Sequence, residues 1–365
     1  MTGTGTSTDP FIVATANDLC NVGNNLSAYY KQTADIDMTG VTFTGIGSDS
    51  TPFTGTFDGN NHIISNLSIA ASTDYTGLFN EVNAGTLKNI KLYKETINST
   101  KGYVGGLAGK TTNNTNVTNC GVSDVTIIGA NYVGGLFGTC GGSAIKCFAV
   151  GLKLKSISIM LGGFAGGMTE NVATVYNISQ CFIEGTLDGT GQTFVGGFGA
   201  MIGGNYLISD CFVQCNIKGS TYTGGFAGFF GGASYQTVLH KCYTASPITT
   251  TSADVGGFFG TMGSSTEIAD CFWDKNVSIV TTDKSVITGS NFGKSTEETT
   301  AQMQTQSTFT NYDFSNIWAI NSGEYPHLQY YQEINPNPTP PTTPTYKQNY
   351  HNLSSPMFGA FSPLF

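Results

Sequence analysis

The stretch YVGGLFG at Tyr132–Gly138 recurs along the chain with small changes. The copies read YVGGLAG at 103–109, LGGFAGG at 161–167, FVGGFGA at 194–200, YTGGFAG at 222–228 and DVGGFFG at 254–260. The first glycines of the six phrases are nearly evenly spaced, at Gly105, Gly134, Gly162, Gly196, Gly224 and Gly256, and a weaker copy, YTGLFN, lies at 75–80. A phrase that returns at a period of about 30 residues indicates a repeat architecture.

A second phrase repeats in step with the first and carries a cysteine. It is found at Cys120, Cys147, Cys181, Cys211, Cys242 and Cys271. Glycine and β-branched residues interrupt every window in which a helical repeat would need a helix, while short alternating segments such as QCFIEGTL favour strands. We therefore predict an all-β fold, a right-handed parallel β-helix (β-solenoid) of about seven coils whose turns stack about 4.8 Å apart.

The paired glycines are predicted to form the corner of each coil. A sharp bend needs φ > 0, which a residue without Cβ adopts at little cost. The residue after each pair is expected to point into the core, and these residues are Leu107, Leu136, Phe164, Phe198, Phe226 and Phe258.

Alternation assigns the two faces of the strand that follows the cysteine. The six cysteines are predicted to point inward as a core ladder of small hydrophobic side chains. The next residues, Phe148, Phe182, Phe212, Tyr243 and Phe272, are predicted to form an exposed aromatic stripe and are interface candidates. The alternative is that a segment of the same chain covers the stripe. Disulfides are the alternative for the thiols, with Cys20, Cys140 and Cys215 as the best bridge candidates outside the ladder.

The composition restricts the possible partners. The chain of 365 residues has a net charge of −9 and no arginine, and only 11% of its residues are charged. Nucleic acid is not expected as a partner, because phosphate binding needs clustered Lys and Arg. No apolar run is long enough for a transmembrane helix, so no membrane span is expected.

Eight Asn-X-Ser/Thr sequons favour an extracellular or cell-surface glycoprotein. The candidate glycosylation sites are Asn25, Asn66, Asn98, Asn113, Asn116, Asn177, Asn276 and Asn352. The alternative is that a chain rich in Asn and Thr contains these sequons by chance.

Five segments are predicted along the chain. They are an N-terminal cap and first coil (1–60), the solenoid (61–290), a C-terminal cap (291–332), a Pro/Thr-rich linker (333–346) and an apolar tail (347–365). The apolar tail residues are candidates for contact with another subunit, and they are Met357, Phe358, Phe361, Leu364 and Phe365. A disordered tail is the alternative.

These phrases resemble the GLUG motif of repeat proteins found at microbial surfaces and in adhesin-like chains. The segment that begins FIVATANDLCNV is similar to the opening of such domains, and the one that ends NSGEYPHLQ is similar to their close. The resemblance covers roughly residues 10–330. It implies a right-handed β-solenoid at the cell surface, and it carries over no catalytic set.

Three functions are compatible with the sequence. The preferred one is a non-enzymatic structural protein that assembles with itself into a filament or layer through its tail. The alternative is an adhesin module that binds carbohydrate or host, and the third is a polysaccharide-degrading enzyme with Asp210 and Asp270 as its two carboxylates. Because the sequence contains no nucleophile triad, phosphate loop or metal-ligand spacing, we predict no catalytic residue, metal or cofactor.

Overall fold

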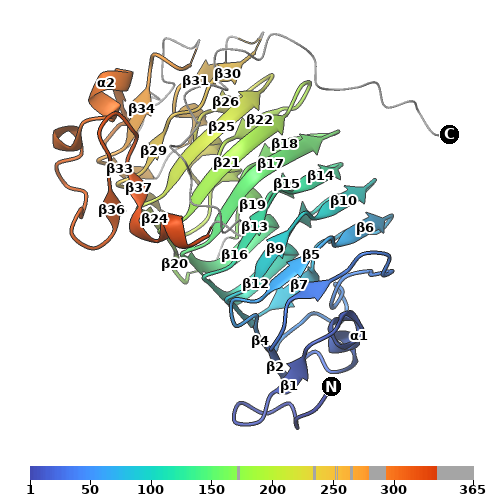
Figure 1. Ribbon diagram of the computed structural model, residues 1–365. Coiled ribbons are helices and arrows are strands. Elements are labelled where there is room, and N and C mark those ends of the chain that lie inside the picture. Colours follow the sequence, from blue (N-terminus) through green and yellow to red (C-terminus); the bar gives the residue numbers. More distant parts are fainter. Residues whose placement is uncertain are drawn as a thin grey trace.

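The chain forms a parallel β-solenoid of about eight turns, which confirms the predicted fold class. The computed structural model describes residues 1–170, 173–232, 236–250, 252, 254–263, 266–278 and 293–334. The turns stack from the N-terminal end, blue in Figure 1, to the last turns, orange in the same view. The predicted apolar tail lies outside the described residues.

Among the described residues, sheet A has 15 strands, more than either of the other solenoid sheets. Its strands are β1 (Phe11–Val13), β2 (Tyr29–Gln32), β4 (Thr56–Asp58), β7 (Phe79–Asn83), β8 (Thr86–Lys88), β12 (Ala108–Thr118), β16 (Phe137–Ile145), β19 (Ala165–Met168), β20 (Tyr176–Ser179), β23 (Gly199–Ile202), β24 (Tyr206–Ser209), β27 (Ala227–Phe230), β28 (Thr237–His240), β32 (Phe259–Met262) and β33 (Thr266–Ala269).

Within the same described ranges, sheet B has 14 strands and sheet C has six. The strands of sheet B are β3 (Ile36–Asp37), β5 (Ile63–Ser65), β6 (Ser68–Ala71), β9 (Lys91–Tyr93), β10 (Thr96–Ser99), β13 (Gly121–Ser123), β14 (Thr126–Gly129), β17 (Phe148–Ser156), β21 (Phe182–Asp188), β25 (Phe212–Lys218), β29 (Tyr243–Thr244), β30 (Ile248–Thr249), β34 (Phe272–Asp274) and β35 (Thr296–Glu298). Those of sheet C are β11 (Val104–Gly105), β15 (Val133–Gly134), β18 (Met160–Gly162), β22 (Phe194–Gly196), β26 (Thr223–Gly224) and β31 (Val255–Gly256).

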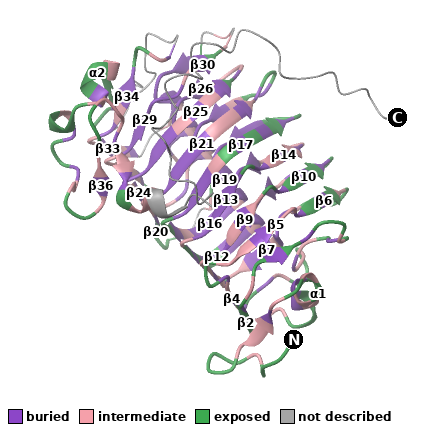
Figure 2. Cartoon of the chain, in the orientation of Figure 1, coloured by how far each residue is buried: buried purple, intermediate pink, exposed green. Residues whose placement is uncertain are grey.

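The register of the sheets follows the sequence repeat. In sheet C the glycine of each phrase pairs with the glycine of the next, as Gly105 does with Gly134. In sheet B, Phe182 pairs with Phe212. Equivalent residues therefore form columns along the solenoid. Buried residues lie mainly on the strands, and most exposed residues lie at the strand ends and in the loops between strands (Figure 2).

The glycine pairs are needed for a different reason from the one predicted. None of them has a positive φ; that conformation is taken two residues earlier, for example by Tyr103 (φ 60°) and Tyr132 (φ 51°). Successive turns instead approach so closely that no side chain fits between them: an ideal Cβ on Gly163 would lie 2.1 Å from the carbonyl oxygen of Gly197. The glycines permit contact between turns rather than a bend.

The residues after the glycine pairs point into the core, as predicted. All six are fully buried. The phenylalanine rings among them stack between turns, with centroids 4.5 Å apart for Phe164 and Phe198 and 4.8 Å for Phe198 and Phe226. At the N-terminal end, Thr15 caps helix α1 (Ala16–Cys20) in a capping box with Asp18, and the 3-10 helix η1 (Asn21–Asn24) follows.

The chain after the last strand of sheet B doubles back along the flank of this sheet. We call residues 299–334 the strap. It contains α2 (Thr300–Met303), η2 (Gln306–Thr308), β36 (Trp318–Ala319), β37 (His327–Leu328) and η3 (Gln329–Ile334). Within the described part of the chain, strands β36 and β37 pair only with each other, so side chains rather than a shared sheet hold the strap in place.

Candidate functional site

The predicted aromatic stripe exists but does not face solvent. Phe148, Phe182, Phe212 and Tyr243 are at most 2% exposed, and Phe272 is half-buried. Consecutive rings stack, with centroids 5.1 Å apart for Phe182 and Phe212 and 5.3 Å for Phe212 and Tyr243. The prediction of an exposed stripe was therefore wrong, and the alternative, cover by the same chain, is confirmed.

The strap supplies that cover with a second set of aromatic rings. Trp318 lies 6.1 Å from Phe212 and 5.9 Å from Tyr243, and Tyr331 lies 5.0 Å from Phe182, all between ring centroids. Together with Met303, Phe309 and Leu328, these rings form a hydrophobic cluster separate from the core inside the solenoid. Because the cluster spans several turns, the strap holds them together along one flank.

Carboxylates of the solenoid accept the polar contacts of the strap. Trp318 Nε1 donates to Asp210 Oδ1 at 3.0 Å, and Tyr325 Oη donates to Asp274 Oδ2 at 2.6 Å. Asn311 Nδ2 donates to Asp270 Oδ1 at 2.8 Å. Asp210 and Asp274 are both buried. These bonds therefore also satisfy buried acceptors.

Asp210 and Asp270, the pair considered for catalysis, thus both bind the strap. They occupy the same corner of two turns, and both take the left-handed conformation, with φ of 52° and 54°. The alternation of strand residues predicted Asp210 on the outer face, which is correct, but this pattern could not reveal the segment that buries it.

A second aromatic column lies on the surface and was missed by the sequence analysis. Tyr75, Tyr103 and Tyr132 are half-buried, with ring centroids 4.8 Å apart for the first pair and 4.7 Å for the second. We call these three residues the tyrosine edge. Its signal was present in the sequence, because each tyrosine stands two residues before the first glycine of its phrase. Since the rings stack on one another, the faces of the central ring are already occupied.

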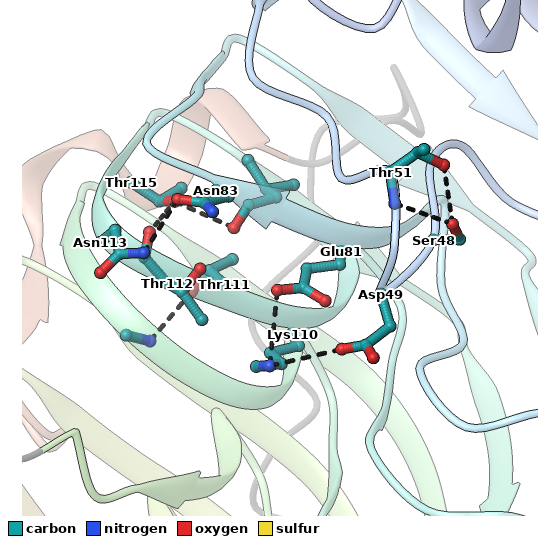
Figure 3. Close-up of polar contacts among 12 residues, drawn as sticks. Ser48, Asp49, Thr51, Glu81, Asn83, Lys110, Thr111, Thr112, Asn113 and Thr115 are labelled. Carbon is teal, nitrogen blue, oxygen red and sulfur yellow. Dashed lines mark hydrogen bonds and ion pairs between the residues drawn. The ribbon is translucent and has the colours of Figure 1, made fainter.

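Figure 3 shows a cluster of charges formed by Lys110, Glu81 and Asp49, and Lys110 also contacts Tyr75 of the tyrosine edge. Lys110 Nζ lies 3.4 Å from Glu81 Oε1, 3.8 Å from Asp49 Oδ1 and 4.9 Å from the centre of the Tyr75 ring. Burial raises the pKa of Glu81, although Lys110 opposes this effect. Burial is the largest single effect on the pKa of Lys110 and lowers it, but Glu81, Tyr75 and Asp49 together raise this pKa by more, so the net direction is upward. The cluster ties the loop that contains Asp49 to the solenoid, and its lysine is neutralised by neighbouring carboxylates.

The six cysteines of the predicted ladder are buried in one column, as expected. Each thiol donates to the carbonyl oxygen two residues earlier, for example Cys211 Sγ to Ser209 O at 3.1 Å. Burial raises the pKa of the Cys147 and Cys242 thiols well above the ordinary value. All nine cysteines lie in the described residues and are unpaired; Cys20 is exposed, and Cys140 and Cys215 are buried.

Most sequon asparagines are on the surface. Asn66 is half-buried, and the exposed ones are Asn25, Asn98, Asn113, Asn116, Asn177 and Asn276. Asn352 lies outside the described residues, as do the tail candidates Met357, Phe358, Phe361, Leu364 and Phe365. The assignment of all eight asparagines as glycosylation sites, and of the tail residues as interface sites, stays a prediction.

The described ranges lack two further features. They contain no group of three or more His, Cys, Asp or Glu side chains placed to hold a metal ion. None of their helices has the length and apolar character needed to cross a membrane.

Comparison with known proteins places this architecture among β-solenoid repeat proteins. A solved structure described as a "putative immunoglobulin A1 protease" from Bacteroides ovatus superposes with a TM-score of 0.54 at 19% identity, over 90% of this chain and 94% of that one. This likeness concerns the fold. No family model matches the chain, and none of the comparisons names the GLUG repeat.

Sequence similarity extends to segments of much longer proteins. The chain is 40% identical to halomucin of Haloquadratum walsbyi over 157 residues, which is 38% of this chain and 2% of halomucin. It is 34% identical over 116 residues, 30% of this chain, to a "putative Gly-rich membrane protein" of Evansella cellulosilytica, and 28% identical over 222 residues, 58% of this chain, to an immunoglobulin A1 protease of Streptococcus sanguinis. The matched region spans 12% and 11% of these two relatives.

Proposed function

We propose that this chain is a structural module that works as a stiff rod outside the cell and assembles with other copies through its C-terminal tail. The observation that carries the proposal is the uninterrupted stack of turns, sealed along one flank by the strap. Main-chain bonds join each turn to the next, and stacked columns of side chains fill the interior. Such a body resists bending because neighbouring turns are joined over sheets A and B and, from β11 to β31, over sheet C as well.

The relatives support a location at or near the cell surface. They are named as a halomucin, a Gly-rich membrane protein and an immunoglobulin A1 protease, and this chain matches only a small part of each. We therefore propose that the solenoid acts as one module among others at the cell surface. The exposed sequons agree with such a location and are proposed as glycan attachment sites.

The proposal assigns no catalytic role to the chain. Asp210 and Asp270 were the candidates for a two-carboxylate mechanism, and each accepts a hydrogen bond from the strap. A structural role for both side chains accounts for their positions.

Removal of residues 335–365 tests the assembly. We expect the shortened chain to keep its circular dichroism spectrum and thermal transition but to sediment as a monomer, while the full chain forms filaments or layers in negative-stain images. A matched control keeps the length of the tail and replaces Met357, Phe358, Phe361, Leu364 and Phe365 by serine. It should also remain monomeric; assembly that persists in both variants would refute the proposal.

A further inference from the structure

A shallow hollow of about 580 Å³ lies in the surface of the strap. Its base is aromatic: Phe309 and Tyr312 are 1% and 6% exposed, and Phe314 is half-buried. Aromatic side chains with a few polar groups around them are the usual composition of small-ligand sites.

The base of the hollow is fixed before any ligand arrives. The ring centroids of Phe309 and Tyr312 are 4.9 Å apart, and Tyr312 lies 4.9 Å from Trp318, which the solenoid holds through Asp210. Tyr312 Oη also donates to the carbonyl oxygen of Asp270 at 3.3 Å. Because these rings are anchored in the cluster beneath the strap, a ligand would meet a rigid surface and bind with little cost of ordering.

One wall of the hollow carries a preoriented carboxylate. Asp313 Oδ1 accepts from the backbone N–H groups of Ser315 and Asn316 at 2.9 and 3.0 Å, and Oδ2 accepts from Asn316 Nδ2 at 2.9 Å. Hydrogen bonds from the Asn316 side chain and from both backbone groups lower the pKa of Asp313, so it is ionised at neutral pH. A fixed anionic acceptor is a strong partner for hydroxyl donors.

The lining also includes neutral donors and acceptors. The side chains of Gln306 and Thr310 line the hollow, are exposed and form no hydrogen bond to another described residue. The strap contains no lysine or arginine, and the charge of Lys241 in the solenoid is offset by Asp313 on which it acts, so a phosphate or carboxylate ligand is disfavoured. Three N–H donors already occupy acceptor sites of Asp313, and the positive charge of Lys241 also acts on this carboxylate, which disfavours a bound cation relative to a neutral ligand with several hydroxyl groups.

We propose that this hollow binds a neutral sugar residue of a glycan. The apolar C–H face of the sugar ring would lie against Phe314, the aromatic ring of the hollow that is partly exposed. Its hydroxyl groups would donate to Asp313 and exchange hydrogen bonds with Gln306 and Thr310. This function is separate from assembly through the tail.

The test uses the full chain and three neutral tetrasaccharides as probes: cellotetraose, maltotetraose and mannotetraose, measured by isothermal titration and saturation-transfer NMR. We expect millimolar binding of at least one, with saturation transferred to its ring protons. Phe314→Ala should weaken this binding about tenfold, because stacking on one aromatic ring is lost. Asp313→Asn should weaken it less, because the side chain keeps its acceptor oxygen.

Tyr29→Ala is the control, because Tyr29 is 41% exposed and lies near the other end of the rod. It should bind as the unaltered chain does, and thermal transitions should show that all variants are folded. The inference is overturned if none of the three sugars binds, if Phe314→Ala binds equally well, or if choline displaces the sugar. Assembly in negative-stain images should be unchanged in every variant. The proposal of sugar binding and the proposal of assembly through the tail can therefore be refuted independently of each other.

Discussion

Glu95 lies in the core of the solenoid, and its replacement by an apolar residue should stabilise the protein in a pH-dependent way. The residue is 1% exposed, and neither carboxyl oxygen has a hydrogen-bond partner among the described residues. Its column neighbours in the adjacent turns are Leu67 and Val125, which are buried and apolar. Burial raises its pKa well above the ordinary 4.5.

The size and sign of the effect follow from this environment. The folded state holds the proton more tightly than the unfolded chain, so this carboxyl reduces stability as the pH rises from 4.5 towards the folded-state pKa. The loss grows by up to about 1.4 kcal/mol per pH unit between these two pKa values and then levels off. Glu95→Leu removes this loss and also the cost of an unpaired buried polar group, about 1–3 kcal/mol at every pH.

Urea unfolding followed by circular dichroism between about pH 4.5 and pH 7 measures both the pH-dependent loss of stability and the pH-independent cost of the unpaired group. The advantage of Glu95→Leu over the unaltered chain should be about 1–3 kcal/mol at the acid end and should grow by up to about 1.4 kcal/mol for each pH unit above it. Glu95→Gln is the control: it removes the proton dependence but keeps a polar group in the core, so its advantage should appear only as the pH rises. A constant difference between the leucine variant and the unaltered chain across this range would refute the reasoning.

Three further predictions concern the turns, the thiols and the strap. Gly163→Ala should destabilise the protein by roughly 3 kcal/mol or more in thermal unfolding, because its Cβ would lie 2.1 Å from a carbonyl oxygen of the next turn. Gly23→Ala, with no atom within 4 Å of the new Cβ, should have little effect, and equal losses would contradict this account of the glycine pairs. A thiol reagent should label Cys20 alone in the native protein and the other cysteines only after unfolding; native labelling of two or more would show that the column is accessible. Trp318→Phe should leave the buried oxygen of Asp210 without its hydrogen-bond donor and lower the free energy of opening the strap by about 1–3 kcal/mol, which hydrogen exchange would report as faster exchange. Unchanged exchange would mean that this bond does not hold the strap.

Much of the solenoid could be predicted from local spacing. A period of about 30 residues with two phrases in step is enough to align the turns, since equivalent residues of stacked turns must occupy equivalent places. The inward direction of Cys211 and the outward direction of Phe212 followed from strand alternation alone. The tyrosine edge could have been found in the same way, because Tyr103 and Tyr132 occupy one position of the phrase.

The amino-acid sequence by itself determined the period, the faces of the strands and the columns that these faces form, because each depends only on residues one or two positions apart and on their return in the next turn. Only the tertiary structure decided what lies over the outer columns. The strap lacks the period, and Trp318 reaches Asp210 from 108 residues away, so no local pattern records that contact. Tertiary packing also decided why the glycines are paired, since the obstacle to a Cβ is the backbone of the next turn rather than the conformation of the glycine itself.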